Sequence, residues 1–345
     1  MTTTVPMTVA RPDARAREAA RRRQDHLVKP PGSLGRLEEL AVWLAGVSGE
    51  ERPALRPRVV VAAADHGVAA EGVSAYPAEV TGQMLGTVAT GRAAVTALAA
   101  AVGAPVTVVD AGVRGAPPMD GVQRLGLAPS ANLATEPALS REALRTALDA
   151  GRELAAAARR RGENVLVGGE LGIGNTTPAT ALACWLTGRA PAELAGPGTG
   201  LDPDGVARKA AVVQRALELH GPAIDGPLEA LRRLGGGEIA VLTGLALGAG
   251  EHGVGLVCDG VIATAAVAIA AELHPDLRAW MLAGHRSAEP AHTALLDHLG
   301  LEPVLDLGMR LGEGSGATAA LAILRVAAAA HAGMATFAEA GVSGA

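Results

Sequence analysis

The chain has 345 residues and a mass of 34.4 kDa, enough for one large domain or two of ordinary size. Hydrophobic residues make up 49% of it but aromatic residues only 1%, so we expect a core of Ala, Val, Leu and Ile. The formal charge of −5 and the few aromatic rings argue against nucleic acid as a partner.

The first predicted elements are two helices within residues 11–49, separated by a break at Pro30–Gly32. The N-terminal segment, residues 1–23, lacks the hydrophobic core of a secretory signal. It is rich in arginine, but Asp13 and Glu18 weaken the interpretation as a transit peptide. We therefore expect a cytoplasmic protein.

Three β-branched runs then alternate with helical stretches. The runs lie at Arg56–Gly67, Ala104–Val113 and Asn164–Gly172, and the helical stretches lie at Glu79–Val102 and Arg141–Gly162. Such alternation is typical of a parallel sheet that helices cover on both faces. The sequence therefore predicts an α/β fold.

Each β-branched run ends in polar residues, which are Asp65 with His66, Asp110, and Glu170. Ligands of parallel sheets bind beyond the carboxyl ends of the strands, so these side chains are candidates for a site. Any one aspartate in such a place commonly caps the next helix instead. The recurrence of the pattern is what favours a site.

Two segments of the second half have recognisable patterns. Val254–Leu273 is the most apolar run, and Asp259 and Glu272 within it favour a buried helix over a membrane span. Pro303–Ala330 has the pattern of a strand, a glycine loop and a helix.

The segment Gly168–Thr180, GGELGIGNTTPAT, carries a partial phosphate-binding motif. From Gly169 onward it matches G-x-x-x-x-G-K-[ST], except that Asn175 stands in the place of lysine. Asparagine cannot neutralise β- and γ-phosphates, which argues against an ATPase. A dinucleotide loop would need glycine where Thr177 stands.

The loop retains a strand, a glycine turn with threonines, and a helix that opens near Pro178. Exposed amides and hydroxyls at a helix N-terminus suit a single phosphate monoester, and Lys209 is a candidate partner for it. Glu170 would repel a polyphosphate but can accept hydrogen bonds from a ribose. The glycines would equally serve a tight turn without a ligand, and a lysine on an amphipathic helix is commonly only solvated.

Glu313 lies between Gly312 and Gly314 in LGMRLGEGSGAT, at a predicted strand-to-helix turn. A carboxylate with no bulky neighbours, near the positive end of a helix, is open to a small ligand and can accept a proton from an N–H nucleophile. The alternative is a helix N-terminal charge that only complements the helix dipole. Flanking glycines are not needed for that role, which favours catalysis.

A polar cluster in EGVSAYPAEVTGQM is a candidate pocket wall. Ser74, Tyr76 and Gln83, followed by Met84, would give an apolar pocket with a few polar anchors. The alternative is a surface loop that leads into a helix at Pro77.

The sequence shows no metal-ligand spacing. Cys184 and Cys258 form no C-x-x-C motif and have no paired histidines beside them. His66, His285 and His292 are possible acid–base groups, although most histidines are structural. We expect no metal and no cofactor.

Eight segments, in order from Lys29 to about Ala317, resemble the nicotinate-nucleotide–dimethylbenzimidazole phosphoribosyltransferase family. They are KPPGSLGRLEELA, ADHGV, EGVSAYPAEVTGQM, GGELGIGNTTPATAL, GGGEIAVLTG, DGVIATAAVA, GHRSAEPAH and LGMRLGEGSGA. Several unusual segments in order are far more specific than any single glycine pattern.

The resemblance implies a fold and an assembly. It implies a Rossmann-like α/β catalytic domain, residues 51–315, and a small helical domain made from residues 1–50 and 316–345. It also implies a homodimer that acts on small molecules, with no membrane or nucleic acid partner.

The resemblance further implies the reaction and its residues. Dimethylbenzimidazole attacks nicotinate mononucleotide, releases nicotinate, inverts the anomeric carbon and yields α-ribazole 5'-phosphate, without metal help. Glu313 is the implied general base. The implied ligands are Glu170 for the ribose, Gly172, Gly174, Asn175 and Thr176 for the phosphate, and Ser74, Tyr76, Gln83 and Met84 for the base.

Two other functions remain open from the sequence. A transferase that uses phosphoribosyl pyrophosphate would carry paired acidic residues after a strand, whereas Asp65 and Asp110 stand singly. A non-catalytic protein that binds the nucleotide or the free base would not need Glu313.

Overall fold

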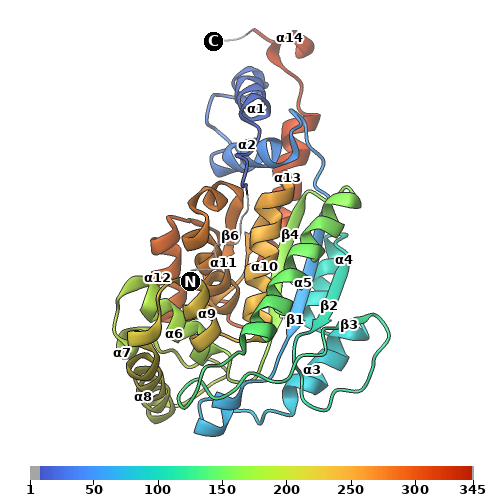
Figure 1. Ribbon diagram of the computed structural model, residues 1–345. Coiled ribbons are helices and arrows are strands. Elements are labelled where there is room, and N and C mark those ends of the chain that lie inside the picture. Colours follow the sequence, from blue (N-terminus) through green and yellow to red (C-terminus); the bar gives the residue numbers. More distant parts are fainter. Residues whose placement is uncertain (1–7, 344–345) are drawn as a thin grey trace.

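The computed structural model describes residues 8–343, and its centre is one parallel sheet of seven strands (Figure 1). The strand order is β3-β2-β1-β4-β5-β6-β7. Their bounds are β1 Pro57–Ala63, β2 Val106–Asp110, β3 Val122–Arg124, β4 Val165–Leu171, β5 Gly255–Cys258, β6 Met281–His285 and β7 Pro303–Leu305. The chain builds outward in one direction from β1 and in the other from β4, so the switch point where ligands bind lies between these two strands.

The two faces of the sheet bury different side chains because successive residues of a strand point to opposite sides. In β1, Val60 and Ala62 belong to one core cluster, and Val59, Val61 and Ala63 to the other. Both faces are therefore apolar, which explains why the strands appear in the sequence as continuous β-branched runs.

Helices cover both faces. One face carries α5 (Arg141–Arg160), α6 (Thr176–Thr187), α8 (Pro203–His220), α9 (Pro227–Leu234), α10 (Gly237–His252), α11 (Val261–Leu273) and α12 (Pro290–Leu299). The other carries α2 (Arg36–Ser48), α3 (Val80–Ala89), α4 (Ala94–Ala101) and α13 (Ser315–Gly333). The short elements are η1 (Gly67–Glu71), α7 (Pro191–Leu194), η2 (Gly221–Ala223), η3 (Pro275–Trp280) and α14 (Phe337–Ala340).

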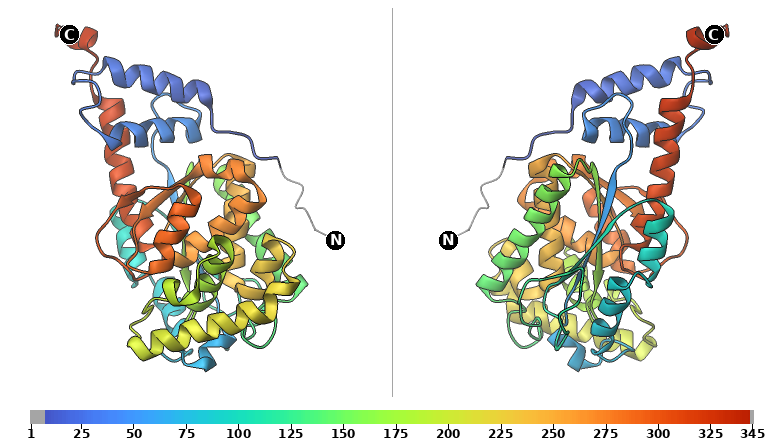
Figure 2. Two further views of the ribbon diagram at one scale, coloured as in Figure 1. Left: turned by 90° about the vertical axis from the view of Figure 1, so that its left-hand side faces the viewer. Right: turned by 90° about the vertical axis from the view of Figure 1, so that its right-hand side faces the viewer.

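The two ends of the chain meet at one end of the molecule. There α1 (Ala14–His26) and α2 lie beside the end of α13 (Figure 2). The Arg23 guanidinium donates to the carbonyl oxygens of His331 at 2.9 Å and Met334 at 2.8 Å. This contact is what a helical domain built from both termini requires, although the domain boundaries stay a prediction.

Two expectations about helices were wrong. Val254–Leu273 is not one helix, because β5 occupies its start and α11 begins only at Val261. A buried strand and a buried helix are equally apolar, so hydropathy alone did not separate them. The stretch Glu79–Val102 is likewise divided, into α3 and α4, around Gly91 with its φ of +75°.

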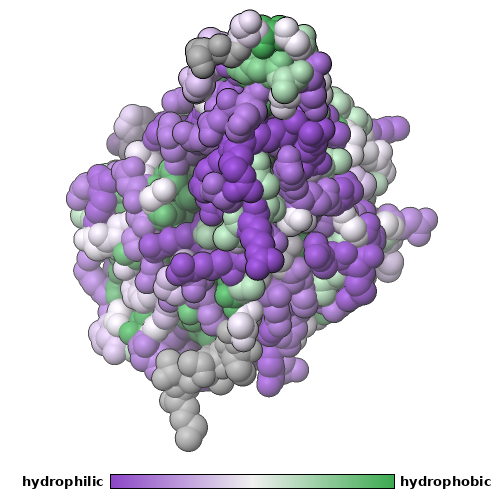
Figure 3. All heavy atoms as spheres, turned by 90° about the horizontal axis from the view of Figure 1, so that it is seen from above, coloured by the Kyte–Doolittle hydropathy of each residue, from purple (hydrophilic) through white to green (hydrophobic). Residues whose placement is uncertain are grey.

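Two apolar helical stretches, Val80–Ala101 and Ser315–Gly333, are long enough to cross a membrane by length and composition alone. The first consists of the separate helices α3 and α4, and half of the second, α13, is buried against the sheet. Seen from the end that carries α1 and α2, by contrast, the surface is largely hydrophilic (Figure 3).

Candidate active site

The glycine loop follows β4 at the switch point of the sheet. Gly174 has a φ of +90°, which favours glycine, and the turn ends where α6 begins at Thr176. The amide of Asn175 donates to the Gly172 carbonyl at 3.1 Å, and the amide of Thr177 to the Gly174 carbonyl at 3.0 Å. The loop is thus a strand-to-helix turn held by its own backbone, with Gly172, Gly174, Asn175 and Thr176 together at the strand end.

Lys209 of α8 reaches this loop from a distant part of the chain. Its side chain is fully buried, and Nζ donates to Thr176 Oγ1 at 3.0 Å and to the Gly196 carbonyl at 2.8 Å. Burial lowers the pKa of Lys209 to about 8, and the nearby charge of Glu289 opposes that shift. A cation from another helix therefore lies at this loop, which has Asn175 where the phosphate-binding motif has lysine.

A second loop, residues 196–200, closes over Lys209. The Gly198 amide donates to Glu289 Oε1 at 2.8 Å, and Arg310 donates to the Gly198 carbonyl at 3.2 Å. Thr199 Oγ1 lies 3.0 Å from Ser74 Oγ and accepts from the Ala75 amide at 3.1 Å. This loop therefore joins the Lys209 end of the site to the segment that contains Ser74.

Glu313 stands on the turn before α13 and packs against the end of β4. Its φ of +62° makes it the one non-glycine residue with positive φ in residues 8–343. Its amide donates to the Glu170 carbonyl at 3.2 Å, and its Oε2 accepts from the Val95 amide at 3.2 Å. A Cβ on Gly312 would lie 2.5 Å from Glu170 Oε1, so a glycine is required there for close approach.

Glu170 links the two turns. Asn175 Nδ2 donates to Glu170 Oε2, while the other carboxylate oxygen lies beside Gly312. The structure therefore places Glu313, Glu170 and the glycine loop at one strand end. The Asn175 side chain faces Glu170, so any contact of Asn175 with a phosphate would come from its backbone.

The acidic groups of this site are shifted toward their protonated forms. Burial raises the pKa of Glu170 to about 8, against the hydrogen bond from Asn175 and with added repulsion from neighbouring carboxylates. The raised pKa favours the protonated form of Glu170, which can donate as well as accept a hydrogen bond. Burial also raises the pKa of Glu313 above the ordinary value for glutamate, with a smaller contribution from the charge of Asp259.

Behind the glycine loop lies a buried pair that the sequence analysis did not identify. His66 Nε2 lies 2.6 Å from Glu238 Oε1, and a Cβ on Gly172 would come within 3.1 Å of both atoms. The strand-end pattern in the sequence predicts His66 but not Glu238. A glutamate directly after the three glycines Gly235–Gly237, at the start of a helix, was the available signal.

The residues predicted for the base pocket occupy different environments. Ser74 is half-buried and contacts Thr199, whereas Tyr76 is 55% exposed. On α3, Gln83 is exposed and Met84 packs against the core. Thr81, from the same helix, accepts the Ile173 amide at 3.0 Å, which joins α3 to the glycine loop. Their roles in binding a base stay a prediction.

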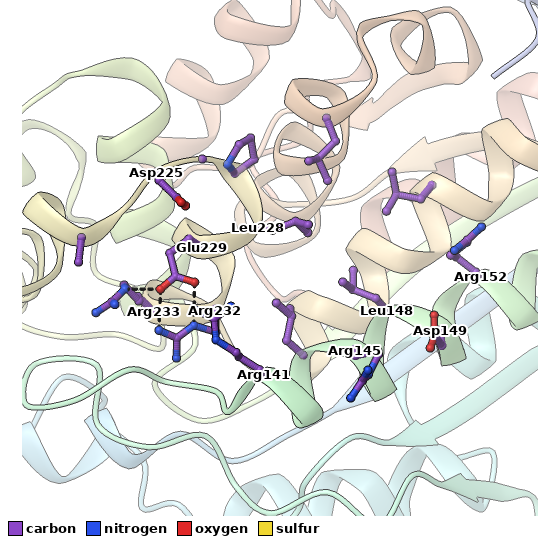
Figure 4. Close-up of a pocket in the computed structure, with 16 residues that line it drawn as sticks. Arg141, Arg145, Leu148, Asp149, Arg152, Asp225, Leu228, Glu229, Arg232 and Arg233 are labelled. Carbon is purple, nitrogen blue, oxygen red and sulfur yellow. Dashed lines mark hydrogen bonds and ion pairs between the residues drawn. The ribbon is translucent and has the colours of Figure 1, made fainter. Parts of the chain in front are cut away.

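A cavity of about 720 Å³ lies elsewhere, between α5, α9 and α10 (Figure 4). Arg232 and Arg233 hold Glu229 on one side of it, and Arg145 of α5 lines the other. None of the predicted site residues lines it.

Among residues 8–343, no group of three or more His, Cys, Asp or Glu side chains is placed to hold a metal ion.

Comparison with known proteins gives full-length matches. A family model described as Phosphoribosyltransferase matches residues 9–342. The nicotinate-nucleotide–dimethylbenzimidazole phosphoribosyltransferase of Ectopseudomonas mendocina (strain ymp) is 52% identical over 331 residues, which cover 95% of this chain and 94% of the relative. The enzyme of the same name from Xanthomonas axonopodis pv. citri (strain 306) is 53% identical over 335 residues, 96% of each chain.

Solved structures agree with these matches. The crystal structure of CobT from Thermus thermophilus superposes with a TM-score of 0.90 at 46% identity, covering 96% of this chain and all of the other. The chain therefore belongs to the nicotinate-nucleotide–dimethylbenzimidazole phosphoribosyltransferase family.

Proposed function

We propose that the chain transfers the phosphoribosyl group of nicotinate mononucleotide to dimethylbenzimidazole or a related base, with Glu313 as the general base. The bond between the anomeric carbon and the pyridinium nitrogen breaks, and its electron pair leaves with nicotinate. One ring nitrogen of the acceptor attacks the opposite face of the ribose. The proton on its other nitrogen passes to the Glu313 carboxylate, and α-ribazole 5'-phosphate results.

The observation that supports this proposal most is the meeting of two turns at one strand end. The glycine loop with Lys209 offers a cradle for one phosphate, and the Glu313 turn lies against the residue before that loop. Glu170 lies between them and is suited to the ribose, since a protonated carboxyl can both donate to and accept from hydroxyl groups. A raised pKa brings the Glu313 carboxylate closer to the basicity that proton abstraction near neutral pH requires.

The direct test incubates the purified protein with nicotinate mononucleotide and a panel of bases, without added metal, and identifies the products by mass. We expect nicotinate and one α-riboside phosphate in equal amounts with dimethylbenzimidazole. A product that forms only with phosphoribosyl pyrophosphate and magnesium would contradict the proposal. Binding of the nucleotide with no nicotinate release would favour a carrier protein.

We also propose that the protein is a homodimer whose partner covers the rim of this site. Fewer than a third of the residues along α3 and α4 are buried, although this stretch is apolar. Tyr76, Leu307 and Leu311 are more than half exposed, and they flank the segments that contact the loop 196–200. An exposed apolar area of this kind is typical of an interface between subunits.

Sedimentation equilibrium tests this assembly. We expect the mass of two 34.4 kDa chains, and Leu307→Asp with Leu311→Asp should shift the protein toward the monomer. A wild-type monomer at micromolar concentration would contradict the proposal.

Cys184 and Cys258 are buried and form no disulfide bond, which fits a reducing compartment. We therefore propose that the protein is located in the cytoplasm.

A further inference from the structure

Asp259 is a buried carboxylate that caps a helix from a different part of the fold. It follows β5 and is 1% exposed. Its Oδ2 accepts from the Gly314 amide at 3.1 Å and its Oδ1 from the Ala317 amide at 2.8 Å. Both amides belong to the start of α13, where the helix itself provides no acceptor because its N-cap residue is Gly314, which has no side chain.

The turn that Asp259 holds is the one that carries Glu313. Gly312, Glu313 and Gly314 have φ values of +84°, +62° and +84°. A left-handed glutamate is less stable than a right-handed one, and the two glycines offer no stiffness, so the turn must be held from outside. The described bonds that do so are the one from the Glu313 amide to the Glu170 carbonyl, at 3.2 Å, those to Asp259, and the one that Glu313 Oε2 accepts from the Val95 amide, at 3.2 Å.

The His285 ring packs beside the Asp259 carboxylate. His285 of β6 lies 3.4 Å away through Nε2, and its ring fills the space beside Gly316, where a Cβ would come within 2.2 Å. His292 of α12 stacks obliquely on His285 with ring centres 5.8 Å apart. The charged neighbours at this strand end are Glu170 and Glu313, which Asp259 repels.

We infer that Asp259 is a positioning residue for phosphoribosyl transfer, because its bonds to the Gly314 and Ala317 amides fix the left-handed turn that aims the Glu313 carboxylate. The inference rests on the proposed role of Glu313 as base. Misplacement of a catalytic group by about 1 Å reduces rate by roughly a hundredfold. Asp259 bonds to the Glu313 turn and the start of α13 and has no described bond to the phosphate cradle, so its loss should act on the chemical step rather than on nucleotide binding.

The test measures kcat and KM in Asp259→Ala and in the milder Asp259→Asn. We expect kcat to fall at least tenfold in Asp259→Ala and less in Asp259→Asn, with KM for nicotinate mononucleotide changed less than threefold. Loss of the Asp259 charge should also move the acid limb of the kcat profile to lower pH, because that charge raises the pKa of Glu313. A purely structural defect would not move this limb. If Asp259→Ala does not fold, Asp259→Asn carries the test.

A double-mutant cycle separates this inference from the proposed function. If Asp259 acts through Glu313, adding Asp259→Asn to Glu313→Gln should lower kcat no further than about twofold. A full additional loss would show that Asp259 acts independently and would overturn the inference, as would a kcat within twofold of wild type in Asp259→Asn with an unmoved acid limb. If Glu313→Gln alone leaves kcat intact, the proposed base fails instead, and the inference fails with it.

Discussion

Glu313→Gln is expected to lower kcat by about 10²- to 10⁴-fold, the usual contribution of a general base. The amide has nearly the same shape and can still accept from the Val95 amide, but it cannot take up the acceptor's proton. KM for nicotinate mononucleotide should change little, because the phosphate end of the site lies at Lys209. Steady-state release of nicotinate, with both substrates varied, measures these effects.

The pH profile adds a second readout of the same residue. Glu313 acts only when ionised, so wild-type kcat should fall as the pH drops through the pKa of Glu313, which burial places above the ordinary value for glutamate. That acid limb should be absent in Glu313→Gln. Glu153→Gln, which changes an exposed glutamate on α5, is the matched control and should leave kcat unaltered. A Glu313→Gln enzyme with kcat within threefold of wild type would remove the base assignment.

Lys209→Met is expected to raise KM for nicotinate mononucleotide by about ten- to a hundredfold, since a hydrogen bond to a charged group contributes about 1.5–3 kcal/mol. The ammonium has three donors, and Thr176 and Gly196 occupy two of them, which leaves one for a phosphate. Methionine keeps most of the buried volume, so the effect should fall on binding of the anion. KM for dimethylbenzimidazole should stay within threefold of wild type.

Nicotinate riboside, which lacks the phosphate, makes the test specific. Wild type and Lys209→Met should use the riboside equally well. The preference of the enzyme for nicotinate mononucleotide over the riboside should therefore be lost in the variant. In wild type, KM for the nucleotide should also rise above a pH of about 8, where the buried Lys209 loses its proton. Arg145→Met, a change of an exposed cation at the cavity of Figure 4, is the control. Equal losses with both donors would show that Lys209 supports the fold rather than the phosphate.

The sequence predicted the three β-branched strands of the first half and the short strand at Pro303, but it missed β3, β5 and β6. Pro57–Ala63, Val106–Asp110 and Val165–Leu171 stand out because valine-rich runs fill both faces of a parallel sheet. The four residues of β5 are followed at once by an apolar helix, so no periodicity marks the boundary. That error also concealed Asp259, which follows β5 as Glu170 closes β4.

Site residues could be predicted where the local sequence determines the backbone conformation. They could not be predicted where contacts between distant segments determine the environment of a side chain. Glycines around Glu313 and in the loop after β4 indicate turns, because few other residues adopt those backbone angles. Nothing local shows that Lys209 is buried, since helix periodicity gives a face but not what covers it. One compositional hint existed: the chain has only two lysines, Lys29 and Lys209, among its 30 cationic residues.

The left-handed backbone of Glu313 has an evolutionary consequence. Glycine or asparagine would fit that angle better, so folding alone favours replacement of the acid, and under the proposed role of Glu313 it is selection for turnover that would retain it. A gene copy that is no longer under that selection can lose the carboxylate and encode a more stable protein. Descendants with glycine or asparagine at this position would then be well-folded pseudoenzymes that still bind the nucleotide.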